Sequence, residues 1–315
     1  MRRTDILIKA ARAVGRNKAN ADLTVSVPDD DILQYLNDAQ DRMQNLISAT
    51  KNISKIFVTQ QIISVVANQE NYEIPDRVLL NKQIENVEYA YAGALGNYVR
   101  LRKVNFINRD TNTSNYPSGY YKRGGEIFLV PIPAVTQGSL RVTYERTLDD
   151  LDIPRGVLSA VTNGTSAQFD TFTLDTTADA YESTTPGWSN IQYASIVDPF
   201  GARKCFNILL GTYNTGTNVV TPSPSPFIYS SNDVQITIGD VAVFGKYTTT
   251  FSGLPDDCER YLIHYAAAEL FRGDSSTDYA AAAAKVDDIE EDTLKALSSQ
   301  TSEVQEIPEH NTYDW

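Results

Sequence analysis

The chain has 315 residues and a formal net charge of −13 at pH 7. This length predicts one large domain or two ordinary ones, with enough core to need no stabilising disulfide or metal. Hydrophobic residues make up 42% and charged residues 21%, which is typical of a globular protein and excludes a mostly disordered chain.

The two cysteines, Cys205 and Cys258, are too few for a disulfide framework or a zinc cluster and indicate a reducing compartment. Two arginines follow Met1, but the apolar run after them is only three residues long, so we expect no secretory signal. The longest nearly apolar stretch, residues 127–135, contains two prolines and is too short to span a membrane. We therefore expect a soluble protein made in the cytosol.

Charge is distributed unevenly along the chain. Residues 1–150 have 19 basic and 17 acidic side chains, residues 151–250 have 4 and 8, and residues 251–315 have 4 and 15. Phosphate binding needs a basic stripe, and in this reading only the first twenty residues qualify. The solvated face of an amphipathic helix is the more ordinary explanation of that run. The acidic C-terminal region should repel DNA.

Two helices are expected at the N-terminus. The first covers residues 3–19, with Ile6, Ala10, Ala13 and Val14 on its apolar side. The second begins after Pro28 with three aspartates, which favour the positive end of a helix dipole. A metal site is disfavoured there because no EF-hand spacing follows. Its expected buried stripe is Ile32, Tyr35 or Leu36, Ala39, Met43, and Leu46 or Ile47.

From residue 56 the pattern changes to short β-branched runs, which predict strands. We expect them at 56–66, 71–76, 85–91, 98–102, 119–122, 126–130 and 139–146. Gly124 and Gly125 predict a hairpin turn. Residues 152–253 are rich in Thr, Ser, Asn, Gly and Pro and predict a separate β-domain, a sandwich or a barrel. Its expected strands are 169–174, 191–197, 204–210, 234–238 and 241–247, and the proline-rich residues 221–226 predict a stiff extended loop.

Helical periodicity resumes at Leu254, with one helix opened by Pro255 and closed by Gly273, and another over about 277–298. An extended tail follows. The predicted fold class is α+β, with a helical bundle core of two N-terminal and two C-terminal helices, a β-rich middle and an inserted small β-domain. The predicted domains are 1–151 and 254–298 for the core, 152–253 for the insert, and 299–315 for the tail.

Motifs for catalysis are absent from the sequence. His264 lies in a helical stripe, where a structural histidine is more common than a base, and His310 lies in the loose tail. The acidic pairs Asp256-Asp257 and Asp287-Asp288 fit solvated helix surfaces better than a glycosidase site. We predict a protein that is not an enzyme and holds no cofactor or metal.

Several segments together resemble the head-to-tail adaptor (connector) proteins of tailed bacteriophages. They are the helix at residues 29–40, the Tyr-Glu-Ile-Pro-Asp turn at 72–76, the strands at 125–133 and 138–146, and the Leu-Pro-Asp-Asp helix at 254–271. The resemblance covers about residues 1–151 and 254–300. In shorter members these halves join directly, so residues 152–253 are a departure from the family pattern.

The resemblance implies a homo-oligomeric ring, commonly of twelve copies, at the head–tail junction of the virion and assembled in the host cytoplasm. Its partners would be the portal protein and a downstream tail or nozzle protein, and DNA would pass through its lumen without specific binding. In such proteins the end of the chain often docks on the portal or a neighbour. The corresponding tail residues here are Val304, Ile307, Pro308, Tyr313 and Trp315. The alanine-rich helix supplies the expected subunit contacts, Ala280, Ala281, Ala284, Val286 and Ile289.

Two other functions remain open at the level of the sequence. One is a receptor- or glycan-binding virion protein that uses the tyrosine-containing β-insert as its binding face. The other is a cell-wall hydrolase that uses a pair of carboxylates.

Overall fold

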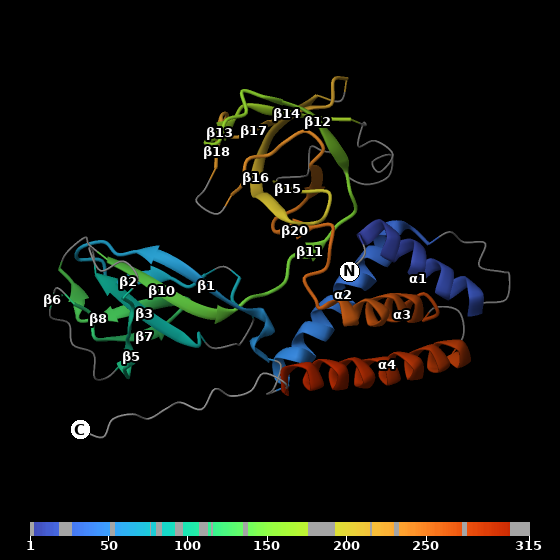
Figure 1. Cartoon of the computed structure of the whole chain (residues 1–315), viewed down its shortest axis with the longest axis horizontal. Helices are drawn as coiled ribbons and strands as arrows, with labels where there is room; N and C mark the ends of the chain where they lie inside the picture. Colours follow the sequence, from blue (N-terminus) through green and yellow to red (C-terminus); the bar gives the residue numbers. More distant parts are fainter. Residues whose placement is uncertain are drawn as a thin grey trace. The chain divides into compact units, whose positions relative to one another are not determined.

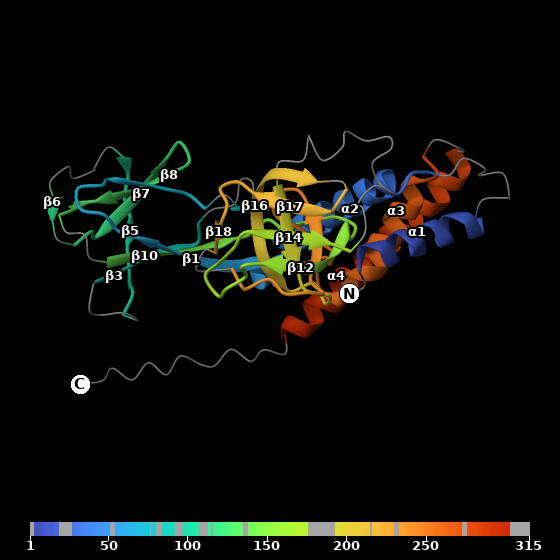
Figure 2. The ribbon, with the colours of Figure 1, turned by 90° about the horizontal axis from the view of Figure 1, so that it is seen from above.

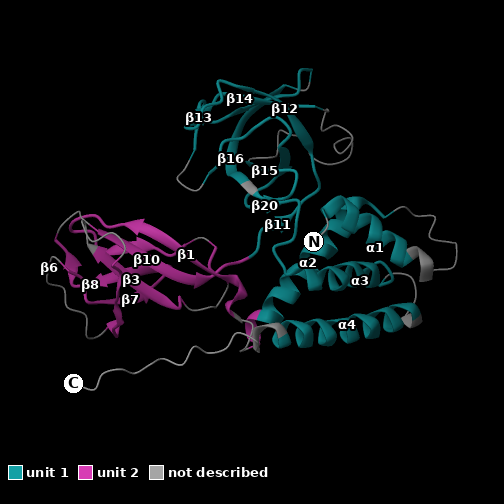
Figure 3. Cartoon of the chain, in the orientation of Figure 1, with its two compact units in different colours: residues 1–47, 148–315 teal, residues 48–147 magenta. Residues whose placement is uncertain are grey.

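The computed structural model describes residues 3–18, 27–50, 54–75, 77–79, 84–91, 97–106, 113–114, 116–134, 138–175, 193–214, 216–229, 233–272 and 276–302. Their contacts divide the chain into two compact units (Figure 3). Unit 1 comprises residues 1–47 and 148–315, and unit 2 comprises residues 48–147. Each unit is described by itself below.

Four α-helices belong to the fold, as expected (Figure 1). They are α1 (Thr4–Lys18), α2 (Asp29–Ala49), α3 (Glu259–Glu269) and α4 (Ser276–Ser302), with a 3₁₀ turn at Asp256–Cys258 before α3. The α3 helix contacts both α1 and α4, so the N-terminal and C-terminal helices pack together. The predicted α+β class is confirmed.

The apolar face predicted for α1 is wrong by about one position. Leu7, Ile8 and Ala11 are almost fully buried, whereas Ile6 is 43% exposed. The buried residues recur at spacings of three and four, which is the period of a helix face. For α2 the stripe is confirmed, and its two open choices resolve to Leu36 and Ile47, both fully buried.

Unit 2 consists mainly of two four-stranded sheets that enclose one apolar core. The first has the order β1-β10-β3-β4 and the second the order β2-β8-β7-β5. The core between them includes Val87, Ile127, Leu140 and Val142, all fully buried. The bounds are β1 Val58–Ser64, β2 Asn71–Glu73, β3 Asn86–Tyr91, β4 Val99–Arg100, β5 Arg102–Lys103, β7 Gly119–Arg123, β8 Glu126–Val130 and β10 Gly138–Glu145, with a short pair β6 Thr113–Ser114 and β9 Ile132–Pro133.

The hairpin predicted at Gly124 and Gly125 is confirmed. Both glycines have positive φ, +61° and +88°. The two-residue turns that match strand twist need that conformation. It places Arg123 opposite Glu126 and sets the register of β7 against β8.

The middle of unit 1 contains a closed barrel of six strands, β12-β14-β17-β16-β15-β19. The strands close into a ring in Figure 1 and are seen from the side in Figure 2. Side chains such as Phe169, Phe172 and Ile208, each at most 1% exposed, fill its core. The bounds are β12 Gly156–Thr162, β14 Thr171–Leu174, β15 Tyr193–Val197, β16 Arg203–Asn214, β17 Val219–Pro222 and β19 Val241–Phe244, with short pairs β13 Gln168–Phe169 with β18 Phe227–Ile228 and β11 Asp150–Leu151 with β20 Thr248–Thr249.

The strand predicted at 234–238 is wrong. Its alternation is real, since Ile236 is buried and Val234 and Ile238 are exposed. However, the Ile236 N–H donates to the Tyr229 hydroxyl (3.0 Å) and the Val234 N–H to the Lys204 carbonyl (2.6 Å), so no ladder forms. The strands β12 and β17 were not predicted.

Candidate functional site

The described residues hold no cluster of three His, Cys, Asp or Glu side chains able to bind a metal. Cys205 and Cys258 are buried and form no disulfide with each other, and His264 is half-buried in α3. The acidic pairs 256–257 and 287–288 are solvent-exposed. His310 lies outside the described residues. The candidate functional features are the two chain segments that connect the helices to the barrel, and the exposed surfaces that a partner could bind.

The chain passes between helices and barrel twice, and the α2 helix binds both passages. Asn37, Gln40 and Gln44 lie at positions i, i+3 and i+7, which share one helix face. Gln40 donates to the Asp149 carbonyl (2.8 Å) and accepts from the Ser252 hydroxyl (2.6 Å). Gln44 accepts from the Leu148 N–H (3.2 Å). Three amide side chains thus hold the backbone at the base of the barrel.

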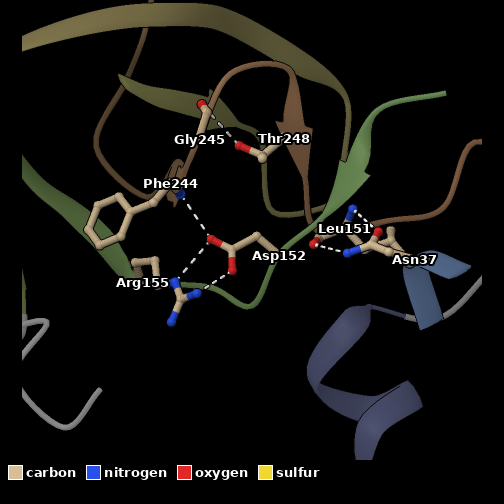
Figure 4. A network of polar contacts seen from close by, with 7 residues as sticks. All are labelled: Asn37, Leu151, Asp152, Arg155, Phe244, Gly245 and Thr248. Atoms are coloured by element: carbon tan, nitrogen blue, oxygen red, sulfur yellow. Dashed lines mark hydrogen bonds and ion pairs between the residues drawn. The ribbon is translucent and has the colours of Figure 1, made fainter. Parts of the chain in front are cut away.

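Asn37 completes the hydrogen bonding of β11 (Figure 4). The N–H groups of Asp150 and Asp152 donate to carbonyls in and beside β20, at 3.0 and 2.9 Å. Because successive residues of a strand point their backbone groups to opposite sides, those of Leu151 face away from β20. The Asn37 amide accepts from the Leu151 N–H (2.7 Å) and donates to its carbonyl (3.0 Å). A side chain thereby takes the place of a neighbouring strand.

The second passage is held by α1. The Thr250 carbonyl accepts from both the N–H and the hydroxyl of Thr4, each at 2.8 Å. Thr4 and Thr250 are fully buried, so water cannot replace these bonds.

A buried ion pair stands where the first passage enters the barrel. Asp152 accepts two hydrogen bonds from the Arg155 guanidinium and one from the Phe244 N–H (2.9 Å; Figure 4). The two side chains are only 6% and 7% exposed. Burial raises the pKa of Asp152, and the charge and hydrogen bonds of Arg155 oppose that rise. This pair fixes the start of β12 against β19.

The family model of the SU10 adaptor protein matches residues 1–183, which is more than half of the chain. The chain belongs to this family. It is therefore a phage adaptor protein, a structural component of the virion. The matched residues include α1, α2, all of unit 2 and the barrel up to β14, so the match runs past the domain boundary predicted at residue 151. No curated protein matches the chain.

The adaptor's α4 helix has a buried and an exposed side. Val286 and Ile289 are 4% and 2% exposed, so they belong to the helix packing of their own chain. Ala280, Ala281 and Ala284 are exposed. Of the predicted subunit contacts, these three alanines are the ones a neighbour can reach. The predicted tail contacts, Val304, Ile307, Pro308, Tyr313 and Trp315, lie outside the described residues.

Arg42 of α2 contacts two acidic residues of α4 in the adaptor. Its guanidinium lies 2.9 Å from a Glu290 carboxylate oxygen and 3.7 Å from one of Asp287, and 5.8 Å from the centre of the Tyr265 ring. The side chain of Arg42 is 45% exposed, so the pairs with the two acids are worth about 1 kcal/mol or less. They orient the helices more than they stabilise them.

Five basic residues of unit 2 of the adaptor lie on three strands: Arg100 on β4, at the edge of the first sheet, and Arg102 and Lys103 on β5 and Lys122 and Arg123 on β7, which are neighbours in the second sheet. We call these five residues the basic patch. Residues 100–103 and residues 122–123 lie about twenty positions apart in sequence. The parallel pairing of β5 with β7 brings the two groups together. The sequence reading missed this patch, although the adjacent basic residues at 102–103 and 122–123 were its signal. None of the described helices of the adaptor is long and apolar enough to cross a membrane.

Proposed function

We propose that the adaptor forms a homo-oligomeric ring, of twelve copies, which joins the portal vertex of a phage head to the tail and leaves a channel for DNA. Membership of the SU10 adaptor family is the observation that carries this proposal. The ring would bind the portal protein on one side and a downstream tail or nozzle protein on the other.

The charge of the chain suits a channel through which DNA must slide. With a net charge of −13 per copy, acidic side chains facing DNA repel its phosphates. Screening extends over about 8 Å at physiological salt, so this repulsion acts at contact range. DNA would then pass without specific binding.

We assign docking on the portal or on a neighbouring copy to the tail. The residues after Ser302 include Val304, Ile307, Tyr313 and Trp315 as apolar anchors in a polar segment. These apolar side chains would supply the surface that is buried against the partner.

Electron microscopy of the adaptor mixed with portal rings tests the ring, which should appear as an added collar on the portal. Deletion of residues 299–315 should abolish docking and leave the fold intact, because Leu297 is the last buried position among the α4 side chains whose burial is described. Changing the four anchors to serine should have the same effect at full length. The matched control, Glu303, Glu306 and Glu309 changed to Gln, should still dock. Wild-type adaptor that stays solitary beside portal rings would refute the proposal.

A receptor- or glycan-binding role keeps one observation in its favour. Phe200, Ile228 and Ile238 on loops and a short strand of the barrel are 86%, 69% and 71% exposed. Because side chains fill the barrel core, any such ligand would bind on the outside. A glycan array probed with wild type and with these three residues changed to serine would reveal that role through a signal that only wild type gives.

A further inference from the structure

The two units of the adaptor carry opposite charge. Unit 2 has 12 lysines and arginines against 8 aspartates and glutamates, a net charge of +4. Unit 1 has 15 against 32, a net charge of −17. A chain with such asymmetry offers two complementary surfaces to further copies of itself.

Five of the nine lysines and arginines that the structure describes in unit 2 form the basic patch. Arg100, Arg102 and Lys103 line one shallow open hollow together with Glu85. Lys103 also lines a second hollow with Lys122 and Phe106. The Arg123 guanidinium lies 5.1 Å from the centre of the Phe106 ring, which holds it beside the second hollow. The two hollows share Lys103, so the residues of the patch lie around adjoining hollows.

Within the described residues, the five cations of the basic patch form no ion pair with an acidic side chain. Glu88, which lies opposite Arg100 in the β3–β4 register, pairs with Arg141 instead. Partial burial and the neighbouring Lys103 ammonium lower the pKa of Lys122. The repulsion between such closely spaced cations falls when an anionic partner binds.

The acidic counterpart lies on α4. Its buried positions include 282, 286, 289, 293 and 297. A shift of two residues turns a helix by about 200°, so 284, 288 and 291 lie on the opposite side. Asp288, Glu291 and Asp292, which we call the acidic face, are all exposed. Glu291 pairs with Lys295 of the same helix (2.6 Å), but both side chains are exposed, so a stronger partner can displace this weak pair. The acidic face continues directly from the exposed alanines, whose small side chains let a partner approach closely.

We propose that the basic patch on unit 2 of one adaptor copy binds the acidic face of α4 on the neighbouring copy. The inference rests on the proposed ring and names the surfaces that close it. A contact between two different surfaces of identical chains is head-to-tail, and such contacts generate rings when the rotation closes. The alanines allow the backbone of α4 to approach, and the charges select the register.

DNA is the other polyanion that a basic patch could bind. The overall charge of −13 opposes a stable contact with phosphates, whereas a second copy brings a surface of opposite sign. We therefore assign the patch to protein, and the experiment below separates the two partners.

Charge reversal tests the contact. One variant carries Arg100→Glu, Arg102→Glu and Lys122→Glu, and the other carries Asp288→Lys, Glu291→Lys and Asp292→Lys. Each alone should weaken association at least about 100-fold, because three attractions become repulsions. Mixed in equal amounts, the two variants should assemble as an alternating ring, since each then meets a complementary neighbour. Both sets of changes in one chain should also restore assembly.

The control reverses the same number of charges elsewhere, with Lys55→Glu, Lys246→Glu and Arg260→Glu, all at exposed positions. Circular dichroism establishes that every variant is folded, and electron microscopy on portal rings scores assembly. Normal rings from the patch variant, or no recovery on mixing, would overturn the inference while leaving the ring itself intact. Normal rings with lost DNA retention in a gel-shift assay would assign the patch to DNA. Wild type that forms no ring refutes the proposed function, and sedimentation of the mixed variants then decides the contact separately.

Discussion

Substitution of Asn37 should be one of the most destabilising changes in unit 1. Changing Asn37 to Ala removes two hydrogen bonds to the Leu151 backbone. Leu151 is only 2% exposed, so water replaces them poorly. A hydrogen bond contributes about 1 kcal/mol net, and a buried group left unpaired costs about 1–3 kcal/mol. Because Asn37 itself is half-buried, water can reach part of the vacated space, and we expect a loss of about 2 kcal/mol.

Native-state hydrogen exchange measures this effect at the site. A loss of about 2 kcal/mol corresponds to roughly 30-fold faster exchange of the Leu151 amide hydrogen, if exchange follows the opening equilibrium. Gln34→Ala, at an exposed position of the same helix, is the matched control and should change exchange at Leu151 less than twofold. Equal exchange rates in both variants would show that the amide does not hold β11, and the strand-replacement argument would fail.

Two shorter predictions concern buried groups. Phe172→Ala in the barrel, at a site 1% exposed, should destabilise the barrel by about 3–5 kcal/mol in urea unfolding, while Ile228→Ala, 69% exposed, should cost less than about 0.5 kcal/mol. Burial raises the pKa of the Cys258 thiol to about 12, so native protein at pH 8 should label with maleimide there far more slowly than urea-unfolded protein, whose thiol pKa is about 8.5. Equal labelling rates would contradict the buried position of Cys258.

The sequence predicts correctly those elements that leave a local pattern. The α2 stripe and the Gly124-Gly125 hairpin were predicted because a buried helix face and a positive-φ turn each leave a local signature. The sequence of α1 has apolar residues on two adjacent stripes, and periodicity alone does not say which one is buried. Packing against α3 buries the stripe with Leu7, Ile8 and Ala11 and leaves Ile6 exposed. In the barrel, β17 ends at Pro222 inside a proline-rich stretch, which concealed a strand.

The candidate site was less accessible to sequence reasoning because its parts are distant in the chain. Asn37, Gln40 and Gln44 look like ordinary surface amides of a helix. Only the fold places them against residues 148–151, more than a hundred positions away. One signal was available, since Gln40 and Gln44 fall beside the apolar stripe rather than opposite it. The basic patch depends in the same way on a parallel strand pair, which local sequence does not specify.

The pairing of β11 with β20 has a consequence for the barrel as an insertion. Asp150 lies beside Thr248 and Leu151 beside Thr249, and the two strands run in the same direction. A short connection could therefore join Leu151 directly to Thr250, which follows β20 on the neighbouring strand. Neighbouring strands lie about 4.8 Å apart and one residue advances about 3.3 Å, so the step is about 6 Å. One glycine between Leu151 and Thr250 spans that distance.

We expect a variant in which a single glycine replaces residues 152–249 to keep α1–α4 and unit 2 folded, because every contact of Thr250 and Ser252 with the helices remains. The matched variant replaces residues 152–253 with five glycines and so has the same length. It keeps the backbone carbonyl that accepts from Thr4, but it loses the two bonds of the Ser252 hydroxyl, to Gln40 and from the Leu254 N–H. At about 1 kcal/mol per bond it should be less stable by about 2 kcal/mol in urea unfolding followed by circular dichroism. Such a difference would place residues 250–253 with the helices rather than with the barrel. A single-glycine variant that fails to fold would instead make the barrel an integral part of the core.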